Sequence, residues 1–254
     1  MAVAYEFPRL PLILFAFDFL LARPRPFHRD CRRILAANPY PRCVEGSELV
    51  LAEGPFILTM NHYNRRGLRP YHGAMAINAA IAERRPQSPY IAWIITSELV
   101  GEHLGSFPIP IAVTRWALAR IARVYGFLLM PPPAAGAVVR ASVARSALRL
   151  VRRHPVGLAP EGGGSGVLRP APPGAGLFLL SLTASGAPVL PVGLWEEEET
   201  LHVRFGEPYT LSLPRSLPRD EQDRLACQQV MTSIGRLLPR TYWGAYEGAL
   251  LAQG

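Results

Sequence analysis

A histidine stands at a point in the sequence where catalytic residues are common. Asn61-His62 follows the apolar run Phe56-Ile57-Leu58-Thr59-Met60 and precedes a helical pattern. In an open α/β sheet, ligands collect where strands end and the connections to helices begin. Because the pKa of an unperturbed histidine is about 6.5, an imidazole at this place is able to act as a general base near neutral pH. His62 is therefore the first candidate catalytic residue, and a purely structural histidine is the alternative.

A second candidate combines a carboxylate with a flexible loop. Glu161 follows a short apolar run, and four small residues come directly after it: Gly162, Gly163, Gly164 and Ser165. Glycines let the backbone approach an anion closely and present N–H groups to it. The spacing matches neither the phosphate-binding P-loop nor Gly-x-Gly-x-x-Gly, and Val167 stands where a serine-hydrolase elbow requires glycine. The loop therefore favours substrate binding over a serine nucleophile.

Strand and helix patterns alternate along the chain and must position these residues. Apolar or β-branched runs predict strands at residues 48–51, 56–60, 90–95, 126–130, 156–159 and 188–193. Helical spacing predicts helices at residues 71–83, 111–124, 137–153, 174–185 and 220–238. This alternation implies an α/β fold with a mostly parallel sheet flanked by helices on both faces. The acidic run Glu196–Glu199 is interpreted as a solvated turn.

The amino-terminal segment has a different character. Residues 10–22 are apolar, but Asp18 interrupts them and they are shorter than the roughly 20 residues that a membrane-spanning helix needs. A secretory signal is not expected, because no basic region precedes this run and no small-residue cleavage site follows it. Arginines that suit anionic headgroups come next: Arg23, Arg25 and Arg29. We expect residues 1–40 to form a membrane-associating hydrophobic helical segment and residues 41–254 the α/β domain; a helix packed on that domain is the alternative.

Composition narrows the classes of function. The net charge is +8 and all 27 basic residues are arginines, so chemistry that needs a lysine, such as a Schiff base, is excluded. Arginine excess suits anionic lipids and phosphates, whereas no nucleic-acid motif accompanies it, so a nucleic-acid partner is not expected. The three cysteines and six histidines show no paired ligand spacing, so no metal site and no disulfide framework are expected. A reducing cytoplasm fits this cysteine usage.

Four short motifs occur in a fixed order between about residues 45 and 210. They are Asn61-His62, Ser97-Glu98-Leu99, Pro160-Glu161-Gly162 and Val189-Leu190-Pro191-Val192-Gly193. In this order and spacing the chain resembles the glycerophospholipid acyltransferases, which include the lysophosphatidic acid and glycerol-3-phosphate acyltransferases. The resemblance implies a role in phospholipid biosynthesis, with an acyl donor on coenzyme A or acyl carrier protein and no cofactor. It also implies that His62 takes the proton from an acceptor hydroxyl, which then attacks the acyl thioester.

The resemblance divides the candidate residues by role. His62 and Glu161 are the candidate catalytic residues. The candidate substrate-binding residues are Asn61, Arg65, Arg66, Gly162, Gly163, Gly164 and Ser165. The partners implied are an acyl thioester, a lysophospholipid or other amphiphilic acceptor, and a membrane surface with anionic lipids. The protein is then expected to be peripheral or monotopic on the cytoplasmic face of a membrane.

The sequence departs from the family pattern at three places, and one of them is the strand at residues 126–130, near which an expected arginine is replaced by prolines. The family has an aspartate five residues after the histidine, whereas this chain has Gly67, so Glu161 or Glu98 is the candidate replacement. The family's third motif continues with threonine and arginine, whereas this chain has Gly163 and Gly164. The lost guanidinium would have held the acceptor's phosphate; the candidates to replace its charge are Arg65, Arg66, Arg69 and Arg169. The alternative function is therefore a catalytically impaired member that binds acyl lipid at the membrane surface.

Overall fold

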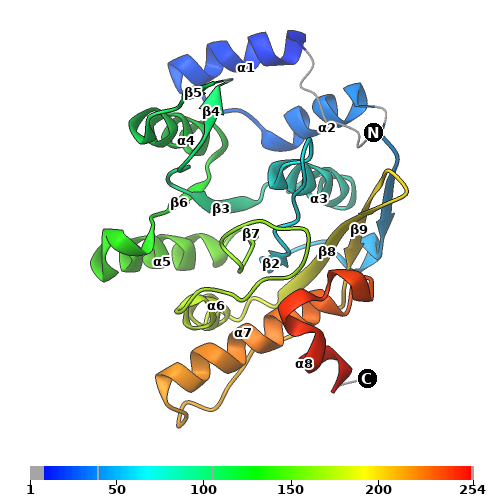
Figure 1. The fold of residues 1–254 in the computed structure, drawn as a ribbon, viewed down its shortest axis with the longest axis vertical. Helices are drawn as coiled ribbons and strands as arrows, with labels where there is room; N and C mark the ends of the chain where they lie inside the picture. Colours follow the sequence, from blue (N-terminus) through cyan, green and yellow to red (C-terminus); the bar gives the residue numbers. More distant parts are fainter. Residues whose placement is uncertain (1–8, 39, 105, 253–254) are drawn as a thin grey trace.

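The protein is a three-layer α/β structure. This computed structural model describes residues 9–38, 40–104 and 106–252, which form a seven-stranded sheet with helices on both faces (Figure 1). Apolar side chains from the sheet contribute to a separate core on each face. The expected fold class, an α/β domain with a mostly parallel sheet flanked by helices, is thereby confirmed.

The sheet is parallel except at one pair of strands. Its order is β1 (Arg42–Glu45), β9 (Thr200–Phe205), β8 (Val189–Glu197), β2 (Ile57–Met60), β7 (Val156–Leu158), β3 (Ala92–Thr96) and β6 (Leu128–Met130). Only β8 and β9 pair in antiparallel fashion, so β1 and β9 run opposite to the other five strands. The central strands β2 and β7 are buried on both faces, as near-continuous apolar sequence predicts for parallel strands. A separate hairpin consists of β4 (His103–Leu104) and β5 (Phe107–Pro108).

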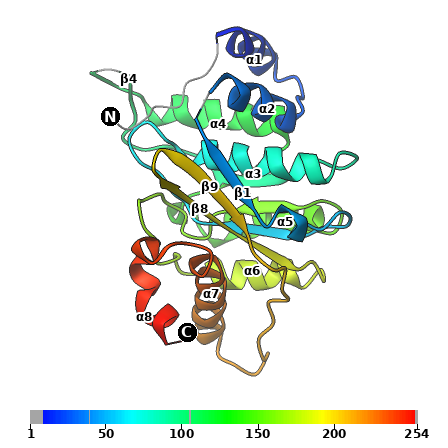
Figure 2. The same cartoon turned by 90° about the vertical axis from the view of Figure 1, so that its right-hand side faces the viewer.

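Helices cover the two faces unequally. On one face α3 (Pro70–Arg84) packs Ile77 and Ile81 against the sheet. On the other face lie α5 (Ala137–Val151), α6 (Ala175–Thr183) and α7 (Arg219–Gly235). On the same side as α3, α4 (Ile111–Tyr125) contacts the edge strand β6. Farther out, α2 (Phe27–Ala37) packs on α3 and α1 (Arg9–Leu21) packs on α4, while α8 (Glu247–Leu251) is the last helix of the described chain (Figures 1 and 2).

Three sequence predictions about secondary structure were wrong. The strand predicted at residues 48–51 is a 3-10 helix, Ser47–Leu49, because the chain turns at Gly46, whose φ of +70° favours glycine. Strands β1 and β9 were not predicted. The acidic run is not a solvated turn throughout: β8 extends to Glu197, and only Glu198 and Glu199, with φ of +48° and +61°, form the turn into β9.

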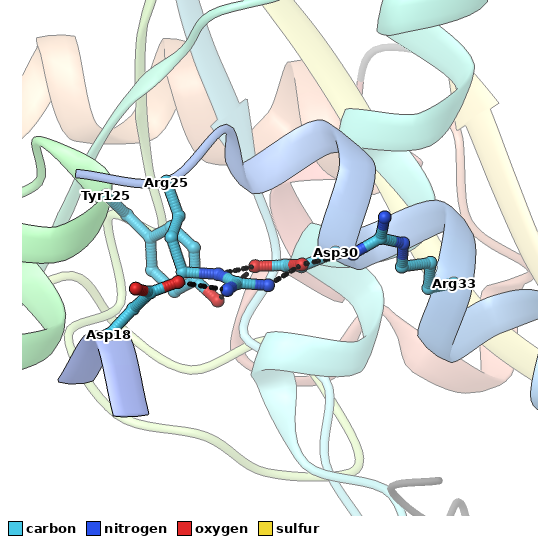
Figure 3. A network of polar contacts seen from close by, with 5 residues as sticks. All are labelled: Asp18, Arg25, Asp30, Arg33 and Tyr125. Carbon is cyan, nitrogen blue, oxygen red and sulfur yellow. Dashed lines mark hydrogen bonds and ion pairs between the residues drawn. The ribbon is translucent and has the colours of Figure 1, made fainter. Parts of the chain in front are cut away.

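A partly buried charge network joins the amino-terminal helices to the domain (Figure 3). The Arg25 guanidinium donates to Asp18 of α1 and, at 2.6 and 2.8 Å, to both carboxylate oxygens of Asp30 in α2. The hydroxyl of Tyr125, the last residue of α4, donates to Asp30 at 3.0 Å. Because a buried charge is costly unless it is paired, this network fixes α1, α2 and α4 relative to one another.

Helix α1 exposes apolar side chains on the side away from the domain. The large exposed ones are Leu12, Ile13, Phe17, Leu20 and Leu21. Phe19 instead packs edge-on against Trp116 of α4, with ring centroids 5.3 Å apart. Within residues 9–38, 40–104 and 106–252, no helix is both long and apolar enough to cross a bilayer.

Candidate active site

His62 and Glu161 lie just beyond the carboxyl ends of two neighbouring parallel strands. Strand β2 ends at Met60 and β7 ends at Leu158, and the two strands pair in parallel register. The Glu161 carboxylate is buried and accepts two backbone hydrogen bonds, one from the N–H of His62 and one from the N–H of Arg169 at 2.7 Å. Glu161 therefore holds the backbone of the histidine and the far end of the glycine-rich loop.

The glycine-rich loop extends the pairing of the two strands past their ends. The N–H of Ser165 donates to the carbonyl of His62, and the N–H of Asn64 donates to the carbonyl of Ser165, both at 3.2 Å. This brings Gly164 against the histidine ring. A Cβ atom on Gly164 would lie 2.6 Å from Nδ1 of His62 and 2.7 Å from Nδ2 of Asn64. Only glycine fits there without displacing one of those side chains.

Asn61 is a buried link between β2 and β8. Its Nδ2 donates to the carbonyl of Leu194 and its Oδ1 accepts from the N–H of Leu194, both at 2.7 Å. Because both polar atoms of the amide are used by one residue of β8, the side chain holds the sheet together directly behind His62. The structure thus places Asn61 just past the end of β2, with its amide bonded to β8; the sequence had made it a candidate for substrate binding.

The imidazole of His62 is half-buried and carries an unsatisfied nitrogen. Its Nδ1 is buried and has no hydrogen-bond partner among the described residues. Burial lowers the pKa of His62 below its ordinary value, because desolvation disfavours the imidazolium. The ring is therefore neutral near pH 7, which is the state a general base requires.

Neither candidate replacement for the missing aspartate reaches Nδ1. Gly67 has a φ of +84° and forms, with Arg66, a tight turn closed by two 3.0 Å hydrogen bonds between the backbones of Arg65 and Leu68. A left-handed residue in such a turn favours glycine, which accounts for Gly67 at this position. Glu98 is paired with Arg115 of α4 at 2.6 Å, and Glu161 bonds to backbone N–H groups.

The candidate arginines fall into two groups. The guanidinium of Arg65 forms a bidentate pair with the half-buried Glu196 of β8 and also donates to the carbonyl of Arg66 at 2.7 Å. Arg69 lies 3.7 Å from Glu102 in a partly exposed pair. Arg66 and Arg169 are both exposed. Arg66 lies in the turn that follows the histidine, and the N–H of Arg169 bonds to Glu161 after the glycine-rich loop.

The remaining loop residues are arranged around backbone contacts. The Ser165 hydroxyl bonds to the carbonyl of Val167, and the N–H of Val167 donates back to it at 3.2 Å. Gly162 has a φ of +65°, and Gly163 has open space around its Cα. Two surface cavities, of about 570 and 410 Å³, lie along α5 and between α7 and α8, and neither is lined by His62 or Glu161.

Comparison with solved structures identifies the architecture around this site. The chain superimposes on the crystal structure of the 1-acyl-sn-glycerophosphate (LPA) acyltransferase PlsC from Thermotoga maritima with a TM-score of 0.51, over 83% of this chain and 78% of that one, at 17% sequence identity. The protein has an acyltransferase fold. No protein-family model and no curated protein matches the sequence. The acyltransferase fold confirms the fold-level part of the sequence resemblance.

Two side chains near the site were not candidates from the sequence. Asn64 places its amide beside Gly164, close to the histidine ring. Its signal was its place two residues after His62, on the same face of an extended segment. Glu196 holds Arg65 and was assigned to a turn. Its signal was the apolar alternation of the strand that follows, since Leu201, Val203 and Phe205 predict a hairpin around the acidic run.

Proposed function

We propose that the protein transfers a fatty acyl group from an acyl thioester to a hydroxyl of an amphiphilic acceptor, with His62 as general base. The observation that carries this proposal is the half-buried imidazole of His62 beyond the end of β2, in a chain with an acyltransferase fold. Burial lowers the pKa of this imidazole and so favours its neutral form. Coenzyme A or acyl carrier protein would carry the acyl group. No cofactor enters the reaction.

The proposed reaction proceeds at Nε2 of His62, since Nδ1 is buried against the loop. Nε2 removes the proton of the acceptor hydroxyl while that oxygen forms a bond to the thioester carbonyl carbon. The carbon–sulfur bond then breaks, and the imidazolium returns the proton to the departing thiolate. Without a carboxylate at Nδ1 the imidazolium is less stabilised, so transfer should be slower than in an enzyme with the full pair.

Binding of the acceptor is assigned to two exposed arginines near the site and to the glycine-rich loop. Arg66 and Arg169 are exposed and offer guanidinium groups that suit a phosphate or another anionic headgroup. Gly162 and Gly163 let a substrate approach the backbone of the loop. Arg65 contributes by holding the turn before α3, through Glu196.

We further propose that the protein works on the cytoplasmic surface of a membrane with anionic lipids. Support comes from α1, whose outward side chains include Ile13, Phe17 and Leu20. The amphiphilic acceptor would then reach the site from the bilayer. Sedimentation with vesicles tests this point: binding should weaken when Phe17 and Leu20 are both changed to serine, and unchanged binding would contradict it.

The function is tested by acceptor-dependent thiol release. Purified protein is mixed with long-chain acyl-coenzyme A or acyl carrier protein and a panel of lysophospholipids and unphosphorylated amphiphiles in vesicles, and the acylated product is identified by mass spectrometry. Stoichiometric product and thiol support the proposal. Tight binding of acyl lipid with no product from any acceptor would instead favour a binding protein, the function suggested by Gly67 and the unpartnered Nδ1.

The dependence of rate on pH follows from the lowered pKa of His62. Because only the neutral imidazole accepts a proton, kcat/KM should be constant through neutral pH and fall on acidification with an apparent pKa below 6.5. A pH profile of thiol release between pH 4.5 and about 8 measures this limb. A midpoint above 6.5 would contradict a desolvated His62 as the base.

Gly164→Ala should slow transfer while leaving the fold intact. The new methyl would meet Nδ1 of His62 at 2.6 Å and must push the ring or the Asn64 amide aside. A displaced base typically costs about 10²-fold in rate. The matched control is Gly166→Ala, whose added methyl meets no atom within 4 Å, and which should keep wild-type kcat. Equal rates in the two variants would show that Gly164 does not position the ring.

A further inference from the structure

Three side chains with metal-ligating atoms gather at one edge of the sheet, away from His62. Cys43 and Glu45 alternate with exposed residues in the edge strand β1, so they share a face. His202 of β9 is the direct register partner of Cys43. Figure 2 looks towards this edge, with β1 and β9 in front.

The donor atoms are spaced as a metal ion would hold them. One ligand atom from each of Cys43, Glu45 and His202 lies within 4.8 Å of the other two, and the Cys43 Sγ lies 3.7 Å from Oε1 of Glu45. A tetrahedral Zn²⁺ with bonds of about 2.3 Å to sulfur and about 2.1 Å to oxygen separates those two ligands by about 3.6 Å.

The imidazole of His202 is held in place by stacking. Its ring lies on the buried indole of Trp195 in β8, with centroids 4.6 Å apart and planes 11° from parallel. Its Nδ1 is buried and has no hydrogen-bond partner among the described residues. A buried ring nitrogen without a hydrogen-bond partner costs free energy. When a metal binds one nitrogen of the imidazole, the other nitrogen carries the proton, so coordination fixes the tautomer of the ring.

Arg204 orients the carboxylate of the cluster. Its Nε donates to Oε2 of Glu45 at 2.7 Å, and its Nη1 donates to the carbonyl of Leu237 at 3.2 Å, just past the end of α7. The guanidinium therefore occupies one carboxylate oxygen and turns the other, Oε1, towards the thiol of Cys43. Such outer contacts fix ligands in protein metal sites.

We propose that Cys43, Glu45 and His202 bind a thiophilic divalent cation of the Zn²⁺ class. A mixed set of sulfur, nitrogen and oxygen donors suits Zn²⁺, and three protein ligands leave one position for water. On binding, the S–H bond of Cys43 breaks, its proton passes to solvent, and the thiolate sulfur forms a bond to the metal. The ion would tie the short edge strand β1 to β9. This inference stands independently of the activity proposed for His62.

The test is metal binding by the full chain after treatment with a chelator. Zn²⁺ is titrated by calorimetry, and Co²⁺ is used as a spectroscopic probe, because a bound thiolate gives a charge-transfer absorption band. We expect one equivalent of Zn²⁺, the thiolate band with Co²⁺, and a higher Tm with Zn²⁺. Cys43→Ser should lose the band and weaken Zn²⁺ binding at least about tenfold, and Arg204→Gln should weaken it about tenfold.

Two further variants keep the test decisive. Cys227→Ser removes a half-buried thiol outside the cluster and should bind Zn²⁺ as the wild type does. His202→Gln removes the nitrogen ligand and, should Cys43→Ser not fold, takes its place as the loss-of-binding variant. Absence of Zn²⁺ binding by the wild type, or equal binding by Cys43→Ser, would overturn the proposal. Loss of the Co²⁺ band in Cys227→Ser would overturn it as well.

Discussion

Replacing His62 with glutamine is expected to lower kcat/KM for acyl transfer by about 10²- to 10⁴-fold, the usual contribution of a general base. Glutamine keeps a polar side chain of similar reach but has no nitrogen that accepts a proton. Since no hydrogen bond to the imidazole ring of His62 holds the fold together among the described residues, the free energy of unfolding should change little. The rate is measured by acceptor-dependent thiol release.

The matched control is His154→Gln. His154 lies just before β7, at the amino end of the strand, and stacks edge-on against Tyr90 with centroids 5.3 Å apart. This variant should keep the wild-type rate. Transfer that survives in His62→Gln would mean that another group is the base, and loss of rate in both variants would mean that the assay reports stability.

Several features of the site were readable from the sequence because they depend on local order. The apolar runs before Asn61 and Pro160 predict strands, and the structure has strands ending at Met60 and Leu158. Parallel neighbours end at the same edge of a sheet, so His62 and Glu161 had to be close once the two strands paired. The glycines after Glu161 likewise indicated a loop whose backbone comes close to another group, and in the structure Gly164 lies against the ring of His62.

Other features depend on contacts between distant segments, which periodicity does not encode. The register of the loop decides that Glu161 bonds to the backbone of His62 and not to its ring. That Arg65 is held by Glu196 depends on the hairpin that continues β8. The edge strand β1 has four residues and pairs with β9 from the far end of the chain, so its own sequence carries little signal.

Replacing Glu161 with alanine is expected to destabilise the protein and to abolish measurable transfer. The variant leaves the N–H groups of His62 and Arg169 without their acceptor, and each orphaned buried donor costs about 1–3 kcal/mol. The free energy of unfolding should therefore fall by about 2–6 kcal/mol, measured by urea denaturation with the slope m compared between variants. The rate of transfer should fall by more than the loss of folded protein explains, because the backbone of His62 loses the hydrogen bond that holds it.

Glu161→Gln separates the two consequences. The amide carbonyl of the glutamine still accepts one N–H, but its NH₂ group faces the second donor. Glu161→Gln should therefore recover about half of the stability that Glu161→Ala loses. Glu207→Ala, at an exposed glutamate after β9, should change stability by less than about 0.5 kcal/mol. If Glu161→Gln were as stable and as active as the wild type, the paired backbone bonds would not position His62. The charge of Glu161, by contrast, matters only if Glu161→Gln remains stable but loses activity, which would assign the carboxylate a part in the reaction itself.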